Sequence, residues 1–159
     1  METALILLAD GLEETEATAV IDLLRRADID TVTCSITQSL TVTGSHNIKI
    51  QADKTIAYIE EDKEYDIIIL PGGQPGTTNL ADSQEVAVLL HNQYKNNKYI
   101  GAICAAPTVL SKLGFLTDKT VTCYPACRQD IKAKAITDSD VEISEKIITS
   151  RGVGTALDF

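Results

Sequence analysis

Short, wholly apolar segments alternate along this chain with longer segments of helical periodicity, and this alternation limits the fold more than any other feature. Residues 4–9 are apolar at every position, as in a central parallel strand that is buried on both faces. From Glu13 onward, apolar side chains recur at the spacing of one helix face, at positions 17, 20, 21 and 24. The pattern predicts an α/β fold with a mostly parallel central sheet.

The same reasoning predicts the remaining elements. Further strands are expected at residues 31–36, 66–70, 98–103, 120–122, 141–144 and 146–149, and a hairpin at 40–42 and 48–50. Further helices are expected at 83–94 and 105–113, the second ending at Gly114. Residues 154–159 have the pattern of a helix start.

The size of the chain indicates a single domain over residues 1–159. Domains cluster at roughly 100–150 residues, and the sequence contains no repeat, linker or low-complexity stretch. Hydrophobic residues make up 44% and charged residues 23% of the chain, which is typical of globular domains rather than disordered ones.

The charge balance excludes some classes of binding partner. The chain has 14 basic and 23 acidic residues, a net charge of −9, and no basic cluster, so we expect neither nucleic acid nor an anionic membrane as a partner. The longest apolar runs are far shorter than the roughly 20 residues of a membrane-spanning helix. The N-terminus has no basic region of the secretory type, so a cytoplasmic location is expected.

The cysteines and histidines indicate no metal site. The four cysteines form no CxxC pair, and the two histidines are not spaced for zinc. Reduced thiols, without a metal or other cofactor, are therefore expected. Cys34 lies inside a predicted strand and is expected in the core.

Cys104 stands where an apolar strand meets a helix with no loop between them. A nucleophile elbow has this arrangement. A thiol at a helix N-terminus is expected to have a lowered pKa, and the amide of Ala105 would face negative charge on the sulfur or on a bound oxyanion. The alternative is that Cys104 is a small buried core residue.

Glu13, Glu14 and Glu16 lie in the first turn of the helix that follows the first strand. Acidic side chains suit the positive end of a helix, which alone can explain them. In a parallel sheet, however, the first and fourth buried strands end at the same edge, so one of these carboxyl groups can face the thiol. Gly72 and Gly73 end another strand at that edge, either as a tight turn or to let backbone amides approach a ligand.

Four segments together resemble one known family. They are Gly11-Leu12-Glu13-Glu14-Thr15-Glu16, Leu70-Pro71-Gly72-Gly73, Ala102-Ile103-Cys104-Ala105-Ala106-Pro107 and Thr149-Ser150-Arg151-Gly152-Val153-Gly154-Thr155. In order and spacing they resemble the ThiJ/PfpI superfamily, most closely the branch of the parkinsonism-linked protein deglycase and its bacterial relatives. The resemblance spans all 159 residues.

The resemblance implies a flavodoxin-like three-layer sandwich, a homodimer, no cofactor, and a cysteine reactive toward oxidants and α-oxoaldehydes. It also implies a C-terminal helix beyond Phe159, which this sequence does not contain. Carried over by position, Cys104 matches the nucleophile and Glu16 the protonated carboxyl that hydrogen-bonds its sulfur. Gly73 and Ala105 match the amides around the sulfur, and Gly72, in the same loop, is a further candidate for a backbone amide that faces an oxyanion.

Two positions depart from that branch. Tyr124 precedes Pro125 where the branch has a histidine, and His46 stands where its best-known member has an arginine that reaches across the dimer. Tyr124 can donate a hydrogen bond, but its ordinary pKa near 10 makes it a poor base at neutral pH. We treat Tyr124 and His46 as candidates that line the site.

Arg26 is a further candidate, which either complements its helix dipole or borders the site. Cys123 and Cys127 bracket Tyr124, either incidentally or to supply a resolving thiol for oxidised Cys104.

Peptidase activity is not expected, because Ala105 replaces the histidine that follows the nucleophile in the protease-like branch. Glutamine amidotransferases of similar fold need a histidine after the nucleophile, and no histidine follows Cys104.

Two functions remain. The first is a cofactor-free glyoxalase III or protein deglycase, which acts on α-oxoaldehydes such as methylglyoxal or on early glycation adducts through Cys104 and Glu16. The second is a non-enzymatic oxidative-stress sensor or redox chaperone, in which Cys104 oxidises to a sulfinate. We favour the enzyme, although the missing histidine shifts weight toward the sensor.

Overall fold

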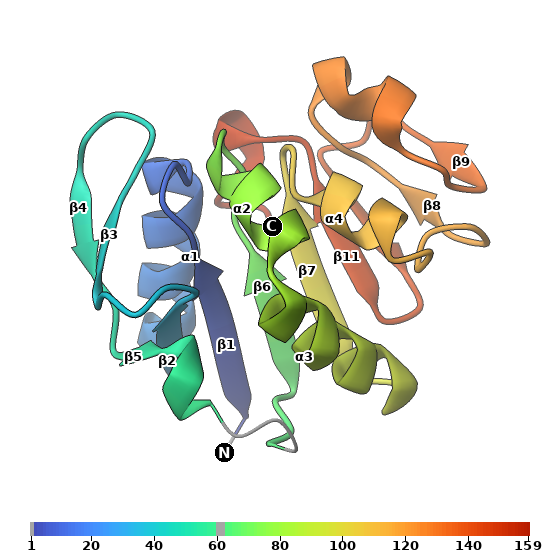
Figure 1. Cartoon of the computed structure of the whole chain (residues 1–159). Helices are drawn as coiled ribbons and strands as arrows, with labels where there is room; N and C mark the ends of the chain where they lie inside the picture. Colours follow the sequence, from blue (N-terminus) through green and yellow to red (C-terminus); the bar gives the residue numbers. More distant parts are fainter. Residues whose placement is uncertain (1, 60–62) are drawn as a thin grey trace.

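A seven-stranded sheet forms the centre of the molecule in the computed structural model, which describes residues 2–59 and 63–159 (Figure 1). Its strands are β1 (Thr3–Leu8), β2 (Asp30–Ser35), β5 (Lys54–Thr55), β6 (Ile67–Leu70), β7 (Tyr99–Ile103), β10 (Val141–Ser144) and β11 (Ile147–Ser150). Their spatial order is β10-β11-β7-β6-β1-β2-β5. Only the β10–β11 pair within this described sheet is antiparallel.

The strand order confirms the flavodoxin-like fold. Taken in chain order, the five longer parallel strands β1, β2, β6, β7 and β11 are arranged 2-1-3-4-5, which is the flavodoxin-like order. In such a sheet the direction of winding reverses between the first and third strands, here β1 and β6. Ligand sites of this architecture lie outside the carboxyl ends of the strands at that point.

Helices cover both faces of the sheet and make the three layers. α1 (Glu14–Arg26) lies on one face, and α2 (Gly76–Asp82), α3 (Gln84–Lys95) and α4 (Pro107–Lys112) lie on the other (Figure 1). Strand β1 serves both layers, since Leu5 and Leu7 pack in the α2–α4 core while Ile6 and Leu8 pack in the α1 core. All four side chains are fully buried, which accounts for the unbroken apolar run in the sequence.

Smaller elements complete the chain. They are the hairpin β3 (Thr41–Thr43) and β4 (Lys49–Gln51), the pair β8 (Thr120–Val121) and β9 (Ala135–Ile136), and the 3-10 turns η1 (Ile56–Tyr58), η2 (Pro125–Asp130) and η3 (Val153–Thr155). The helix start expected at residues 154–159 is instead the short turn η3, followed by a 3.1 Å hydrogen bond from the Phe159 N–H to the Thr155 carbonyl.

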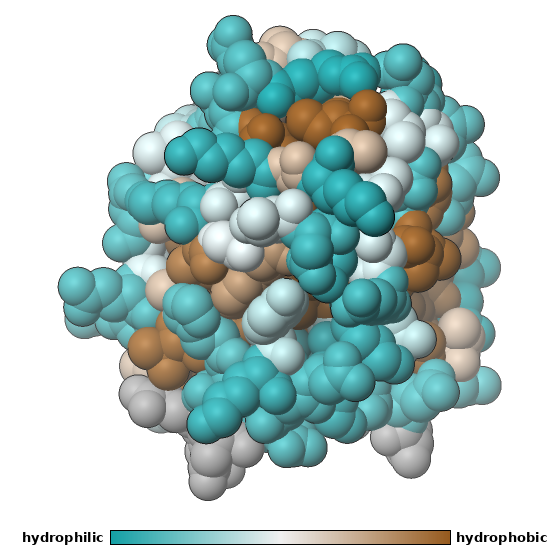
Figure 2. Space-filling view, turned by 90° about the vertical axis from the view of Figure 1, so that its right-hand side faces the viewer, coloured by the Kyte–Doolittle hydropathy of each residue, from teal (hydrophilic) through white to brown (hydrophobic). Residues whose placement is uncertain are grey.

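The surface shows no extended apolar face in the view of Figure 2, the side of the molecule that carries β8 and β9. Hydrophobic residues form separate small patches there, between hydrophilic side chains (Figure 2). Such scattered patches are ordinary for a folded domain. Across residues 2–59 and 63–159, no helix combines the length and apolar character needed to cross a bilayer.

Candidate active site

The carboxyl ends of three adjacent strands bring the candidate residues together. In the order β7-β6-β1, these strands are followed by Cys104, by the Pro71–Gly73 loop, and by the loop that leads to Glu13. The N–H of Glu13 donates to the carbonyl oxygen of Gly72 at 2.9 Å, which ties two of these loops together. The expected meeting of the cysteine, the glycines and the acidic turn is therefore present.

Cys104 adopts the backbone conformation of a nucleophile elbow. Its φ angle is 63°, in the left-handed region that residues with a Cβ rarely occupy. The conformation is held from both sides, because the Cys104 N–H donates to Ser150 O at 2.9 Å and its carbonyl accepts from the Tyr124 N–H at 2.8 Å. The turn lifts the thiol out of the strand, and α4 begins only at Pro107.

Glu16 is the carboxyl group set against this thiol. Its side chain is fully buried, and the Gly72 N–H donates to Oε2 at 2.8 Å. The other oxygen, Oε1, is buried and makes no conventional hydrogen bond with the described residues. Glu13 fixes the turn that presents Glu16, since a Glu13 carboxylate oxygen accepts the Glu16 N–H at 2.8 Å as the helix N-cap.

Gly72 leaves the space in which the cysteine and the carboxyl meet. A Cβ at this position would lie 2.6 Å from the Cys104 Cβ and 2.7 Å from Glu16 Oε2. Both distances are shorter than van der Waals contact, so no larger residue fits here without displacing the pair. Gly72 was expected to supply a backbone amide to the sulfur or to an oxyanion, but its N–H donates to the Glu16 carboxyl instead.

Burial governs the ionisation of both groups. It raises the pKa of Glu16 to about 7, although hydrogen bonds with the Cys104 thiol and the Gly72 N–H act in the opposite direction. Burial also raises the pKa of Cys104 to about 12, and the nearby Glu16 carboxylate adds to this rise. The backbone N–H groups of Ala105 and Gly73 favour the thiolate but do not outweigh burial.

The lowered thiol pKa expected from the helix N-terminus is therefore wrong in direction. The helix starts three residues beyond Cys104, and a buried carboxylate beside the sulfur makes a second negative charge costly. A raised Glu16 pKa agrees with the expectation of a protonated carboxyl. The pair is best described as two coupled groups that exchange protons.

A cavity of about 470 Å³ opens onto the pair. Its lining residues are Glu13, Glu16, Cys104, Tyr124, Pro125, Arg151, Gly152, Val153, Gly154 and Thr155. Tyr124, whose exposed fraction is 48%, thus reaches the site as expected. The lining by Arg151 to Thr155 was not predicted, although the glycines at 152 and 154 were visible in the sequence as part of a family motif.

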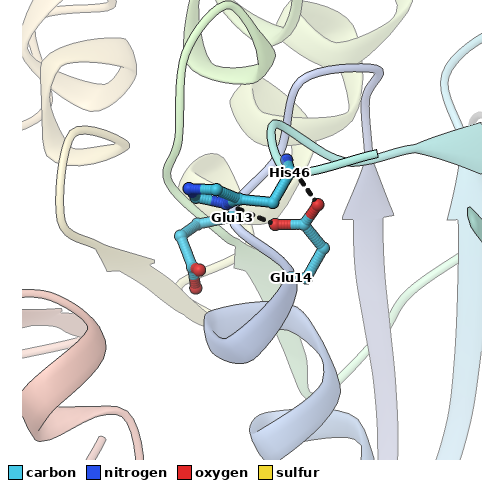
Figure 3. A group of neighbouring side chains, drawn as sticks. All are labelled: Glu13, Glu14 and His46. Carbon is cyan, nitrogen blue, oxygen red and sulfur yellow. Dashed lines mark hydrogen bonds and ion pairs between the residues drawn. The ribbon is translucent and has the colours of Figure 1, made fainter. Parts of the chain in front are cut away.

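His46 does not line this cavity, so its expected site-lining role is corrected. It lies in the loop between β3 and β4, next to Glu13, which does line the cavity. The backbone N–H of His46 donates to Glu14 Oε1 at 2.7 Å, and its ring Nδ1 lies 3.1 Å from Glu14 Oε2 (Figure 3). Glu14 is buried, which opposes its ionisation, but these contacts and the Ile48 N–H hold its pKa below the usual value. Glu13, Glu14 and His46 offer possible metal-ligand atoms within 4.8 Å of one another.

Arg26 does not border the site, so that alternative is corrected. It lies at the opposite end of α1 from Glu16, and its Nε bonds Asp22 at 2.7 Å on an exposed surface. Its other expected role, at the carboxyl end of the helix, fits this position. Cys34 is buried in β2 as expected.

Cys123 is buried and Cys127 half-buried, next to the site-lining Tyr124. Burial raises the pKa of the Cys123 thiol to about 11, and the neighbouring Cys127 contributes to that rise. A thiolate is therefore disfavoured at Cys123. The resolving role for these thiols stays a prediction.

Comparison with known proteins relates the whole chain to one family. Residues 2–159 match the DJ-1/PfpI family. The chain is 38% identical over 156 residues to Protein DJ-1 homolog B of Arabidopsis thaliana, covering 98% of this chain but only 35% of that protein. It is 35% identical over 161 residues to Glutathione-independent glyoxalase DJR-1.2 of Caenorhabditis elegans, covering 99% of this chain and 84% of that protein.

Solved structures have the same overall fold as this chain. Drosophila melanogaster DJ-1beta superposes with a TM-score of 0.95 at 35% identity, covering 99% of this chain and 85% of that one. Oxidized Toxoplasma gondii DJ-1 superposes with a TM-score of 0.94 at 35% identity, covering 99% and 86%.

Proposed function

The chain belongs to the DJ-1/PfpI family, and from that premise we propose that it is a cofactor-free, cysteine-dependent glyoxalase or deglycase. Its substrates would be α-oxoaldehydes such as methylglyoxal, or early glycation adducts. The observation that carries the proposal is the buried Glu16 carboxyl set against the strained Cys104 thiol in an open cavity. The similarity to a named glyoxalase adds support.

The first step is addition of the thiol to the aldehyde. The Cys104 sulfur forms a bond to the aldehyde carbon while its proton passes to the Glu16 carboxylate. Glu16 then gives that proton to the new alkoxide, which leaves a hemithioacetal. A carboxyl whose pKa is about 7 suits both halves of this exchange, because it is neither too weak a base nor too weak an acid at neutral pH.

Two hydrogens then change places on the adduct. Glu16 takes the hydrogen from the carbon bound to sulfur and returns it to the neighbouring carbon, while the hydroxyl hydrogen moves to the neighbouring oxygen. The product is a 2-hydroxyacyl thioester, and the N–H groups of Gly73 and Ala105 favour negative charge beside the sulfur. Hydrolysis of the thioester releases the 2-hydroxy acid and restores the thiol.

The decisive experiment measures lactate formed from methylglyoxal by the wild type and by Cys104→Ser. We expect slow lactate formation by the wild type, because Tyr124 replaces the histidine of the family branch, and none above background by Cys104→Ser. Equal rates in the two proteins would end the enzymatic proposal.

A redox sensor or chaperone is the second candidate. Tyr124 in the place of the histidine favours it, and the same amides and carboxyl that surround the thiol suit a cysteine sulfinate. Peroxide treatment followed by peptide mass spectrometry tests this role. Oxidation that begins at Cys123 or Cys34 rather than Cys104 would contradict it.

The proposal includes a homodimer in the cytoplasm, where thiols stay reduced. The association state rests on the family resemblance. Sedimentation equilibrium of the full natural chain tests it, and a monomer at micromolar concentration would contradict this part of the proposal.

A further inference from the structure

Three side chains that can bind a metal ion converge beside the cysteine cavity. They are Glu13 and Glu14 at the start of α1 and His46 in the loop between β3 and β4 (Figure 3). One carboxylate oxygen from each glutamate and one ring nitrogen of His46 all lie within 4.8 Å of one another. His46 Nδ1 lies 3.1 Å from Glu14 Oε2. Ligand atoms around a tetrahedral zinc ion are about 3.4 Å apart, so this pair already has nearly that separation.

The donor set suits a transition-metal ion of the zinc class. Imidazole nitrogen binds Zn²⁺ and its neighbours in the first transition series, whereas Mg²⁺ and Ca²⁺ prefer sets of oxygen atoms. Two carboxylates balance the charge of a divalent ion, and three protein ligands leave the fourth tetrahedral position for water. The net charge of −9 also favours cations over anions near the protein.

Backbone hydrogen bonds hold two of the ligands in place. Glu14 is buried, and the His46 N–H donates to its Oε1 at 2.7 Å, which leaves Oε2 facing the imidazole ring. Glu13 is fixed as the N-cap of α1, because its Oε2 accepts the Glu16 N–H at 2.8 Å. A carboxylate oxygen that accepts one hydrogen bond keeps a further lone pair, so neither contact has to break when an ion binds. Supporting contacts of this kind strengthen metal sites by about 10–100-fold.

Coordination does not depend on the position of the ring proton. His46 Nδ1 lies 3.1 Å from both Glu14 Oε2 and Ser45 Oγ, so either hydrogen-bond pattern fits the free ring. In each neutral tautomer one ring nitrogen keeps a lone pair, and a bound ion selects the tautomer whose lone pair faces it. All three ligands come from one chain, so the site needs neither a solvent-exposed ring nor a residue of a second copy.

We propose that Glu13, Glu14 and His46 bind one divalent ion of the zinc class and thereby tie the β3–β4 loop to α1. The start of α1 carries positive partial charge, which opposes a cation, so binding depends on both carboxylates. Only the fold brings position 46 to positions 13 and 14, which is why the spacing of the histidines did not predict this site. The inference is independent of the proposed function, because no step of that reaction uses the ion.

Binding is measured with Zn²⁺ by isothermal titration calorimetry and with Co²⁺ by absorption spectroscopy. All proteins carry Cys104→Ser, so that the thiol in the neighbouring cavity cannot bind the ion. We expect one ion per chain with micromolar affinity, and d–d absorption of Co²⁺ without the near-ultraviolet band of a cobalt–thiolate bond. His46→Gln and Glu13→Gln should each lose more than about 100-fold in affinity, above the range for residues that only support a ligand.

His91→Gln is the matched control, because His91 lies on α3 and packs against Phe115. Glutamine at position 46 keeps the backbone N–H that binds Glu14, so His46→Gln should retain the circular dichroism of the parent protein. Zn²⁺ at a hundredfold excess over the parent Kd should raise the melting temperature by about 5–10 °C in the parent and in His91→Gln. The same addition should leave the melting temperature of His46→Gln unchanged.

Three outcomes would overturn the proposal. One is full affinity for Zn²⁺ in His46→Gln. Another is adventitious binding only, with several ions per chain at millimolar Zn²⁺ and no rise in melting temperature. The third is a cobalt–thiolate band, which would assign the ion to the remaining cysteines.

Discussion

Two carboxyl groups on the first turn of α1 are both buried, yet their pKa values move in opposite directions. The pKa of Glu14 is lowered, because the His46 backbone, the His46 ring and the Ile48 N–H donate to it despite its burial. The pKa of Glu16 is raised to about 7, because burial outweighs the contacts with the Cys104 thiol and the Gly72 N–H. Burial alone therefore does not decide the role of a carboxyl group; the number of donors around it does.

The comparison separates a fixed charge from a proton carrier. Glu14 has the contacts of an anchor, holding the β3–β4 loop and orienting His46. Glu16 has an oxygen without a conventional partner and titrates in the neutral range, as a proton shuttle requires. Four predictions follow from this contrast, from the largest effect to the smallest.

Glu16→Gln should lower lactate formation by about 10²–10⁴-fold, the range for loss of general acid–base assistance. Glutamine keeps the volume and an oxygen for the Gly72 N–H but cannot carry a proton. Steady-state turnover at saturating methylglyoxal measures the loss, and Glu85→Gln on the exposed start of α3 is the matched control. A Glu16→Gln rate close to that of the wild type would show that Glu16 is not the proton carrier.

The stability contribution of Glu16 should decrease as the pH rises. Its pKa in the folded state, about 7, lies above the unfolded value of 4.5, so the folded state binds the extra proton between these values. The contribution is complete below pH 4.5 and lost by about pH 7, a change on the order of 3 kcal/mol. Urea unfolding of the wild type and Glu16→Gln across this range measures it, and a constant difference would contradict it.

Glu14→Gln should show the opposite pH dependence. The folded-state pKa of Glu14 is lowered, so its contribution is present above the unfolded pKa and lost as the pH falls. Loss of its charge-assisted hydrogen bonds should cost about 1.5–3 kcal/mol at pH 7. In the same urea series, the difference from wild type should shrink on acidification, and a difference that grows would refute the anchoring role.

Tyr124→His would add an imidazole to the cavity, as a third titratable group to compare with Glu14 and Glu16. An imidazole there would supply a base near neutral pH, and we expect turnover to rise by about tenfold, less than a full general-base effect. Tyr124→Phe should change the rate little, because the phenol is a poor base. Lactate assays of both variants test this, and a rate in Tyr124→His below that of wild type would contradict it.

Much of the fold was predictable because the strands of this sheet are buried on both faces. Leu5 to Leu8 alternate between two apolar cores, so the strand appears in the sequence as an unbroken apolar run. α2 was not predicted, since its glycine, threonines and asparagine have low helix propensity and it is held by packing. β5 and β9 are two residues long, too short to show a period.

The sequence predicted which residues meet at the site, because their positions follow from the strand ends. It did not predict their pKa values, because these depend on hydrogen-bond donors from distant parts of the chain. Sheet topology alone brings Cys104, Gly72 and Glu16 to one edge. The distinction between Glu14 and Glu16 depends on a loop more than 30 residues away, whose N–H groups reach Glu14 only in the folded chain. The pKa of the Cys104 thiol also depends on the folded chain. The sequence suggested that a helix N-terminus lowers this pKa, but burial of the thiol raises it.

Direct titration of the carboxyl groups tests the central claim, that Glu16 carries a proton near neutral pH while Glu14 does not. The protein is labelled with ¹³C at the glutamate carboxyl carbon, and the chemical shifts are followed by NMR as a function of pH. We expect one resonance with a midpoint of about 7, absent from Glu16→Gln, and a second buried resonance, absent from Glu14→Gln, with a midpoint below the usual glutamate value. A Glu16 resonance that titrates with the exposed glutamates would contradict the account.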